Sequence, residues 1–199
     1  MTLALVCVLS YLIGSIPSGL ILGKGLWHVD LREHGSYNIG ATNAWRTLGK
    51  TAGLLIFAFD LAKGAIGVWL GLYFTAEPLV MVIGGILAIV GHSWSIFLKF
   101  KGGKGVATGL GVIVMLMPFV TIWVFAIWFV LVYVTKYVSL GSIVAAAFVP
   151  ILAFCFGAPA EYICFGIVAA IFVIYRHKAN ILRLLSGTES KIKAASHQK

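Results

Sequence analysis

The sequence contains little charge. Only 11% of its 199 residues are Asp, Glu, Lys or Arg, whereas 61% are hydrophobic and the mean hydropathy is +1.03. A soluble globular domain usually has about 25% charged residues. The composition therefore excludes a soluble globular protein and predicts an integral membrane protein, with a length that suits one domain.

Acidic residues are the scarcest charged residues. Six Asp and Glu residues stand against fifteen Lys and Arg residues, which gives a formal net charge of +9. In a membrane protein, an excess of basic residues sets the orientation of the spans and attracts anionic lipid. We therefore expect membrane lipid as a partner, and no nucleic acid.

Cysteine is also rare, and the three cysteines stand apart from one another. Cys7, Cys155 and Cys164 each lie in an apolar stretch, with no CxxC pair and no neighbouring His or Asp. Isolated thiols of this kind are usually buried packing residues. The sequence therefore predicts inert cysteines, and we expect no metal and no cofactor.

Long apolar runs fill most of the chain, and a spanning helix needs about 20 such residues. The first run continues past Pro17 with no small-residue cleavage site, so we expect a retained span rather than a signal peptide. Residues 106–134 are too long for one span, and Pro118 stands where a helix would break. The sequence thus predicts an all-α fold with seven transmembrane helices. The expected spans are residues 3–23, 51–74, 79–98, 106–117, 119–134, 138–156 and 161–175, followed by a tail of residues 176–199.

The distribution of basic residues supports a count of seven. With seven spans, one side of the membrane receives every Lys and Arg except Lys63, and the other side has only short connections. Merging the fourth and fifth spans would place Lys136 opposite Lys101 and remove this asymmetry. By the positive-inside rule, the N-terminus lies outside and the tail lies in the cytoplasm. We expect a multi-pass protein of the cell membrane.

The first polar segment, residues 32–50, combines small polar residues with glycine and arginine. Residues 41–48 are expected as a short helix at the membrane interface, whose N-terminal N–H groups would face an anion. For any single Asn or Ser, a turn or a cap is the alternative. The candidate site residues here are Ser36, Asn38, Gly40, Thr42, Asn43 and Arg46.

The second polar segment reads KFKGGKGVATG over residues 99–109. It lacks the GxxxxGK[ST] order of a nucleotide-binding loop, so ATP or GTP binding is not supported. Consecutive glycines nevertheless let backbone N–H groups approach an oxyanion while a lysine supplies a charge. The alternative is an ordinary loop whose lysines only orient the protein. The candidates are Gly102, Gly103, Lys104, Gly105 and Thr108.

The third polar segment follows the last expected span. His177 and Asn180 stand three residues apart, which places them on one face of a helix. A solvated basic tail is the alternative. Ser142, at the start of the sixth span, could reach the same place.

Charged and polar residues also occur within the spans. Asp60 and Lys63 stand three residues apart on the second span, and we expect a structural ion pair, because unpaired charge is costly in a membrane. A lone histidine such as His92 is more often packed and hydrogen-bonded than reactive.

Four segments, in this order, resemble the bacterial membrane glycerol-3-phosphate acyltransferases that use acyl phosphate as donor. They are GSYNIGATN (residues 35–43) with Arg46 following, DLAKG (60–64), GHSWSIFLKFKGGKGVAT (91–108) and HKANILRLLSGTE (177–189). The matches cover most of the chain, and the resemblance implies a small seven-helix membrane bundle. Three positions depart from the family pattern: Tyr37 stands where the family has glycine, Ile39 where it has proline, and Ser95 where it tends to have proline.

The resemblance implies a reaction and a site. A fatty acyl group would pass from acyl phosphate to the 1-hydroxyl of glycerol 3-phosphate, releasing phosphate and 1-acylglycerol 3-phosphate (lysophosphatidate), at the cytoplasmic membrane edge. This is the first acylation step of phospholipid synthesis. Catalytic roles are implied for Ser36, Arg46, Lys104, His177 and Asn180. Substrate-binding roles are implied for Asn38, Gly40, Thr42, Asn43, Gly102, Gly103, Gly105, Thr108 and Ser142.

Two other classes of protein share parts of this pattern. An anion carrier would use the same cationic loops, but it needs polar residues near the middle of the membrane, and the outer half here is nearly all apolar. A noncatalytic lipid-binding scaffold is the other alternative. If the protein is an acyltransferase, we expect direct transfer with no acyl-enzyme, because the sequence offers no convincing nucleophile.

Overall fold

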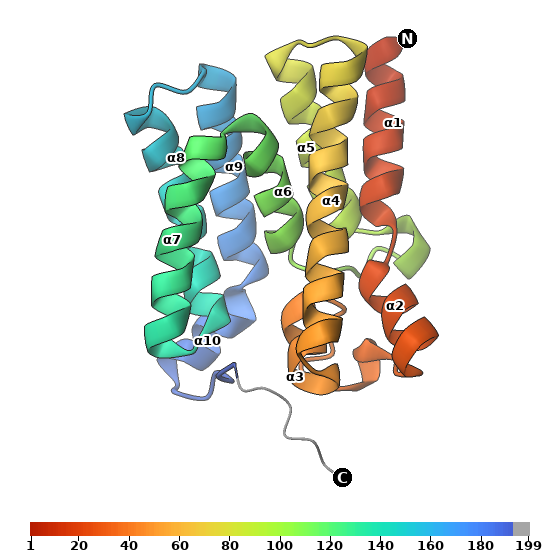
Figure 1. Ribbon diagram of the computed structural model, residues 1–199, viewed down its shortest axis with the longest axis vertical. Helices are drawn as coiled ribbons and strands as arrows, with labels where there is room; N and C mark the ends of the chain where they lie inside the picture. Colours follow the sequence, from red (N-terminus) through yellow and green to blue (C-terminus); the bar gives the residue numbers. More distant parts are fainter. Residues whose placement is uncertain (193–199) are drawn as a thin grey trace.

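Every regular element in the computed structural model, which describes residues 1–192, is a helix. The long helices run side by side, and most of the short helices lie at the end opposite the N-terminus (Figure 1). The long helices are α1 (Thr2–Ser15), α4 (Lys50–Phe74), α5 (Pro78–Ser93), α6 (Val106–Leu116), α7 (Pro118–Thr135), α8 (Val138–Cys155) and α9 (Ala160–Arg176). The short ones are α2 (Ser18–Trp27), α3 (Ala41–Leu48) and α10 (Lys178–Leu185), with the 3-10 helices η1 (Leu31–Glu33) and η2 (Ile96–Leu98).

Several of these helices suit a membrane. Five helical stretches are long and apolar enough to cross one, and α9 with α10, which are bent by 60° relative to each other, make a sixth if they count as one span. Large apolar side chains such as Phe119, Ile122 and Phe154 are exposed on the outside of the bundle, as lipid-facing residues are. The protein is therefore an all-α membrane protein. A count of seven depends on α6, which has 11 residues, and stays a prediction.

The first expected span, residues 3–23, lies within one apolar stretch long enough to cross a membrane, Thr2–Trp27, but the helix is interrupted within it. α1 ends at Ser15 and α2 begins at Ser18, because Pro17 has no N–H group with which to continue the helix. The carbonyl of Ile16 at this break accepts a hydrogen bond from Nζ of Lys63 at 2.9 Å. The break therefore turns a backbone acceptor toward the interior of the bundle.

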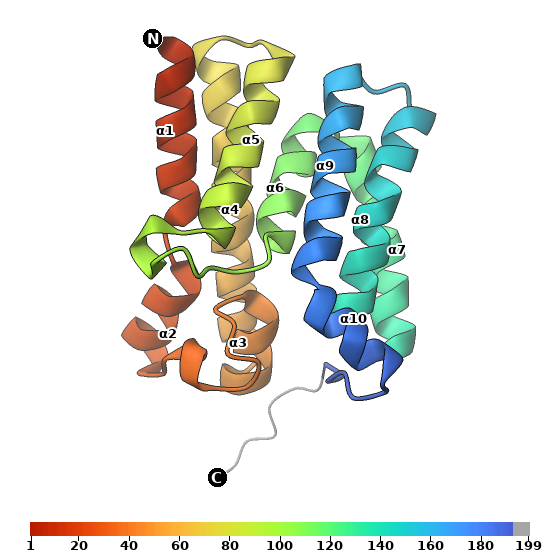
Figure 2. The ribbon, with the colours of Figure 1, turned by 180° about the vertical axis from the view of Figure 1, so that it is seen from behind.

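The helices form two groups. α1, α4, α5 and α6 pack closely together, and α7, α8 and α9 form the second group (Figures 1 and 2). A hydrophobic core that includes Val112 of α6 and Phe165 of α9 joins them. The two groups meet most directly where α5 and α6 face α9, and this seam positions the site described below.

Glycine lets the backbones of α4 and α6 come into contact. A Cβ atom on Gly64 would overlap the carbonyl oxygen of Thr108, and one on Gly111 would overlap the carbonyl oxygen of Leu61. Membrane helices associate through such small residues because lipid gives no hydrophobic driving force between them. The α4–α6 contact therefore fixes the start of α6 relative to the rest of the first group.

Replacing Gly111 should separate these helices. We expect Gly111→Ala to lower the free energy of unfolding of detergent-solubilised protein by about 1–3 kcal/mol, because its new methyl group would displace α4 backbone. Gly25→Ala is the control, since no atom lies within 4 Å of the place its Cβ would take. Thermal unfolding monitored by size-exclusion chromatography measures both, and equal melting temperatures would contradict the close packing.

Candidate active site

Asn43 organises the first polar segment. This residue is 2% exposed. Its Nδ2 group donates to the carbonyls of Leu31, His34 and Asn38 at 3.1, 3.0 and 2.8 Å, and its Oδ1 accepts from the Ser36 N–H at 2.9 Å. The amide therefore holds the loop before α3 in shape. The Asn43 side chain, which was expected to contact a substrate, therefore binds backbone groups of the protein itself.

The neighbouring residues show how the loop enters α3. Tyr37 has a φ of 58°, the left-handed region that suits glycine, which is the residue the family resemblance leads one to expect here. Asn38 Oδ1 accepts from the Gly40 N–H at 2.9 Å, just before α3 begins at Ala41. The expected helix over residues 41–48 is confirmed. Ser36 is exposed, and Thr42 is half-buried on the first turn of the helix.

The glycine-rich loop folds back on the end of α5. The N–H groups of Gly102 and Gly103 donate to the carbonyls of Ser93 and His92, at 3.1 and 3.0 Å. Nη2 of Arg176 donates to the Gly103 carbonyl at 2.6 Å and to the Gly102 carbonyl at 3.3 Å. These two N–H groups thus bind protein carbonyls instead of facing an anion, which differs from the sequence-based expectation. The hydrogen bonds of Gly102 and Gly103 instead fix the backbone directly before Lys104.

Lys104 joins the two groups of helices. Its Nζ donates to Oδ1 of Asn180 on α10, and Nδ2 of Asn180 donates to Oε1 of Glu189 at 2.7 Å. Burial lowers the pKa of Lys104 to about 8, while the negative charge of Glu189 opposes this shift and the neighbouring Arg183 and Arg46 add to it. Lys104 is therefore a partly buried ammonium with other cations close by.

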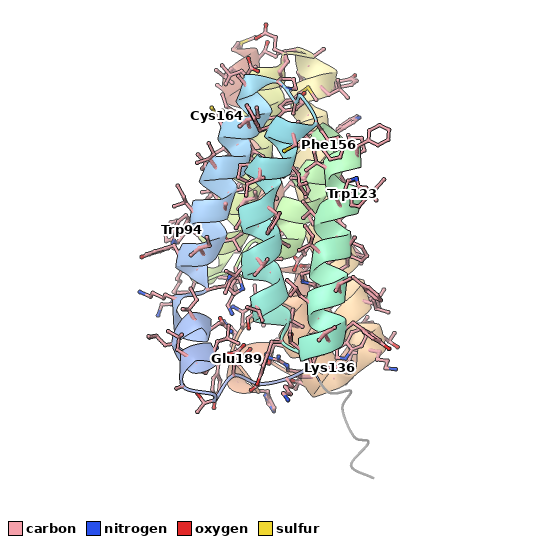
Figure 3. The ribbon with its side chains drawn as sticks, turned by 90° about the vertical axis from the view of Figure 1, so that its left-hand side faces the viewer. Trp94, Trp123, Lys136, Phe156, Cys164 and Glu189 are labelled. Carbon is pink, nitrogen blue, oxygen red and sulfur yellow. The ribbon has the colours of Figure 1, made fainter. Side chains whose placement is uncertain are left out.

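Glu189 ties the C-terminal strap, residues 187–192, to the bundle. Its carboxylate is 7% exposed and also accepts from Ser139 Oγ and Arg183 Nε, each at 2.8 Å. Burial alone would raise the pKa of Glu189, but these hydrogen bonds and the one from Asn180 lower it below its usual range. Figure 3 shows Glu189 at the same end of the molecule as Lys136, far from Phe156 and Cys164.

The strap also reaches the first group of helices. Nη2 of Arg46 on α3 donates to the carbonyl of Ser190 at 2.6 Å, and the N–H of Ile192 donates to the carbonyl of Lys136. Burial lowers the pKa of Arg46, and the charge of Glu189 opposes this shift. The strap therefore places Arg46 near Lys104 and Arg183, although the three residues come from distant parts of the chain.

His177 lies at the bend between α9 and α10 and is 3% exposed. Its Nδ1 lies 2.8 Å from the carbonyl oxygen of Val173. Since a carbonyl can only accept, Nδ1 carries the hydrogen and Nε2 keeps the free lone pair. Burial and the nearby charge of Lys104 lower the pKa of His177 to about 4, so the ring is neutral and Nε2 is its free acceptor.

Two of the expected binding residues make contacts elsewhere. Ser142 Oγ donates to the Val138 carbonyl at 2.9 Å and accepts from Trp128 Nε1 at 3.3 Å, between α7 and α8. Thr108 is fully buried in α6, where its backbone packs on Gly64. By contrast, the structure brings Arg46, Lys104 and Asn180 together.

Four residues to which the sequence assigned no catalytic or binding role complete this cluster: Ser139, Arg176, Arg183 and Glu189. A signal for Glu189 was present, because it is the single acidic residue after position 161 and closes the third polar segment. No comparable signal marks Arg176, whose contacts are with carbonyls of a distant loop. Within residues 1–192, no group of three His, Cys, Asp or Glu side chains could hold a metal ion.

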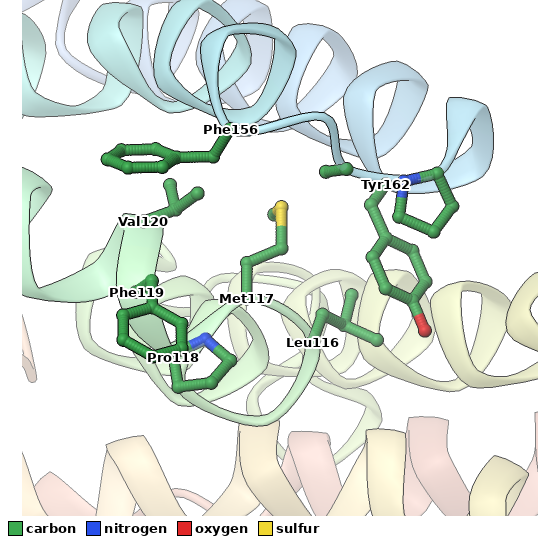
Figure 4. A pocket seen from close by; sticks show the side chains of 9 residues that line it. Leu116, Met117, Pro118, Phe119, Val120, Phe156 and Tyr162 are labelled. Carbon is green, nitrogen blue, oxygen red and sulfur yellow. The ribbon is translucent and has the colours of Figure 1, made fainter.

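An apolar cavity of about 90 Å³ begins beside the cationic cluster. It lies between α5, α6 and α9, and its lining includes Ile89, Gly105, Gly109, Phe165 and Phe172. Gly105 follows Lys104 directly, so the polar and apolar regions meet there. A second apolar cavity, of about 290 Å³, lies at the other end of α6, where its lining includes Leu116, Pro118, Phe156 and Tyr162 (Figure 4).

The chain is similar to one well-defined family. The family model described as "Glycerol-3-phosphate acyltransferase" matches residues 4–187. A glycerol-3-phosphate acyltransferase of Fusobacterium nucleatum is 47% identical over 186 residues, which cover 94% of this chain and 96% of that protein. The corresponding protein of Bacillus subtilis is 45% identical, with coverage of 97% and 99%.

Two crystal structures share the fold. Both are of PlsY (YgiH), an integral membrane glycerol 3-phosphate acyltransferase. The glycerol 3-phosphate form has a TM-score of 0.92 and 38% identity, and the lysophosphatidic acid form has a TM-score of 0.90 and 37% identity. Each comparison covers 97% of this chain and 96% of the other. These likenesses favour an acyltransferase over the anion carrier and the scaffold.

The electrostatics of the cluster predict how Lys104 titrates. In protein whose lysines carry ¹³C-methyl groups, we expect the NMR signal of Lys104, identified by its absence in Lys104→Met, to titrate near pH 8. Glu189→Gln should lower this pKa further, because the lost carboxylate favours the ammonium form. Glu77→Gln, which alters the exposed N-cap of α5, is the control and should change nothing. A Lys104 pKa near its ordinary 10.5 would contradict the burial.

Proposed function

The chain belongs to the glycerol-3-phosphate acyltransferase family, and we propose that it transfers a fatty acyl group from acyl phosphate to the 1-hydroxyl of sn-glycerol 3-phosphate. The products are 1-acylglycerol 3-phosphate and inorganic phosphate, in the first acylation step of phospholipid synthesis. One observation carries the proposal: a cationic cluster and an apolar cavity meet at Gly105. A donor with a phosphate head and a hydrocarbon tail fits such a junction.

The cationic cluster supports binding of phosphorylated substrates. Lys104, Arg46 and Arg183 lie close enough to affect one another's charge, and Glu189 is the single carboxylate that offsets them among the charges acting on Lys104. Lysine and arginine bind phosphate through charge-assisted hydrogen bonds. The excess of positive charge therefore favours a phosphate dianion beside Lys104. His177 and Asn180, on the α10 side, are proposed to contact glycerol 3-phosphate.

The apolar cavity supports the acyl chain of the donor. Its end at Gly105 adjoins the cluster, and its walls come from α5, α6 and α9. Between Gly105 and Leu116, α6 rises by about 16 Å. One leaflet of a bilayer core is about 15 Å thick, which is the reach of a lipid tail. A chain that follows this seam would span the leaflet, with its carbonyl at Gly105.

The proposed chemistry is a direct transfer. The 1-hydroxyl oxygen attacks the carbonyl carbon, the bond from this carbon to the phosphate oxygen breaks, and phosphate leaves with the electron pair. The hydroxyl proton has two acceptors in this arrangement, Nε2 of His177 and a phosphate oxygen of the substrate. A mixed anhydride is already activated, so a covalent enzyme intermediate would add little. Cys7 is half-buried on α1, and Cys155 and Cys164 are exposed on α8 and α9 instead of buried as expected. Figure 3 shows Cys164 far from Glu189 and so from the cationic cluster.

We also propose seven spans, with α6 as the short fourth one, an outside N-terminus and a cytoplasmic active site. The supporting observation is that α2, α3 and α10 lie at the end of the bundle opposite the N-terminus, and the glycine-rich loop crosses the bundle above them (Figure 2). This end carries nearly all the basic residues, which favours the cytoplasmic side. A water-soluble substrate would enter from there.

Replacing Lys104 tests the function. Purified protein should convert acyl phosphate and glycerol 3-phosphate to lysophosphatidate and phosphate, and Lys104→Met should lower kcat/KM by about 100-fold or more, since a pre-positioned cation is lost. Lys101→Met is the matched control: it removes the same charge from an exposed position in the same loop and should retain most activity. Product formation from acyl-CoA but not from acyl phosphate would refute the proposed donor.

Topology can be tested separately, in a variant whose three native cysteines are replaced. Single cysteines at Glu77 or Ala160, which are exposed in short connections, should react with an impermeant maleimide from outside intact cells. A cysteine at Ser190 should react only after the cells are permeabilised. Labelling of position 190 in intact cells would rule out the seven-span arrangement.

A further inference from the structure

A network of polar side chains lies buried beneath the glycine-rich loop. Nζ of Lys63 lies 2.7 Å from Asp60 Oδ1, 3.2 Å from His92 Nδ1 and 3.3 Å from Ser18 Oγ. Asp60, Lys63 and His92 are each at most 5% exposed. The expected ion pair between Asp60 and Lys63 is confirmed, but it has a third member, His92, that comes from α5.

Stability alone does not account for this network. Moving two charges out of water costs several kcal/mol each, and apolar replacements of a buried ion pair are often as stable or more so. A buried ion pair is therefore better explained by what it positions. Here the network reaches the glycine-rich loop through His92, because one edge of the ring contacts Lys63 and the other edge contacts Gly103.

His92 contacts both charged members of the network. Its Nδ1 lies 3.2 Å from Lys63 Nζ and 3.5 Å from Asp60 Oδ1. The opposite edge of the ring carries Nε2. This edge lies against Gly103: the three atoms nearest to the place of a Gly103 Cβ are Nε2, Cε1 and Cδ2 of His92, and Nε2 would overlap it. Gly103 is thus seated on the imidazole.

We propose that His92, held by Lys63 and Asp60, is a positioning residue that seats the glycine-rich loop and so aims Lys104 at the substrate phosphate. The backbone contributes as well, because the His92 carbonyl accepts from the Gly103 N–H at 3.0 Å. Arg176 holds the same two peptides from α9. The loop is therefore clamped from both helix groups immediately before Lys104. This inference rests on the proposed function for its link to catalysis.

A double-mutant cycle tests whether the contact between His92 and Gly103 positions the loop. In Gly103→Ala, the new methyl group should meet the ring and displace Lys104, which lowers kcat/KM for glycerol 3-phosphate by about 100-fold. His92→Asn removes Nε2 and Cε1 but keeps an oxygen in the place of Nδ1 to accept from Lys63. We expect it to fold and to lose about 10-fold. The double variant should be about as active as His92→Asn alone, because the shorter side chain makes room for the methyl group.

Gly102→Ala is the matched control. Its Cβ would overlap the carbonyl group of His92, which belongs to the backbone. His92→Asn leaves that carbonyl in place, so it should not rescue Gly102→Ala. Losses that multiply in the Gly103→Ala, His92→Asn double variant would overturn the proposal, and so would wild-type activity of Gly103→Ala. The second result applies even if His92→Asn fails to fold.

A readout without activity separates this inference from the proposed reaction. In Gly103→Ala, the ¹³C-methyl signal of Lys104 should titrate at a higher pH than in the wild type, because the displaced ammonium becomes more exposed to water. An unchanged Lys104 pKa in Gly103→Ala would overturn the proposed role of His92. If the wild-type protein makes no lysophosphatidate but the Lys104 pKa still rises in Gly103→Ala, the proposed function is wrong and the positioning role of His92 is supported.

Discussion

The hydrogen bond from Lys104 to Asn180 is the contact on which the site depends, because it joins the glycine-rich loop of the first group of helices to α10, which follows α9 of the second group. A partly buried ammonium needs a partner, and a neutral amide satisfies only its hydrogen-bonding capacity. The opposing charge comes from Glu189, which accepts a hydrogen bond from the same Asn180 side chain. The cluster therefore keeps more positive than negative charge, and a substrate phosphate would supply the remainder.

The inner network has a different charge balance. Asp60 and Lys63 offset each other, and His92 contacts both of them. Paired charges cost less at membrane depth than unpaired ones, so this network can lie inside the bundle. The two networks meet where Gly103 contacts His92. A buried network of paired charges thus supports the loop that carries Lys104.

Much of this arrangement could be predicted from residue types and order. Helix α3 has the expected bounds, and Arg46, Lys104 and Asn180 lie together as the resemblance implied. Hydrogen-bond partners could not be predicted, because sequence gives a residue's chemistry and not its neighbours. For this reason the N–H groups of Gly102 and Gly103 were expected to face an anion, and the resemblance placed Asn43 at a substrate although its alternative, a structural role, is the one the hydrogen bonds support. The sequence also did not show that the carbonyl of Ile16, at the break before Pro17, accepts a hydrogen bond from Lys63.

The junction at Gly105 gives a place for the carbonyl of the proposed donor. In a donor with an anionic head and an apolar tail the carbonyl lies between them, so we propose that it binds where the cationic cluster ends and the apolar cavity begins. Gly105 has a φ of 77°, which turns the chain from the loop into α6 at little steric cost. A side chain here would also meet Ile89 and Phe172 in the cavity wall. Gly105 therefore makes the turn into α6 and leaves room for the proposed carbonyl. Any larger residue at this position would disturb both the loop and the proposed place of the reaction.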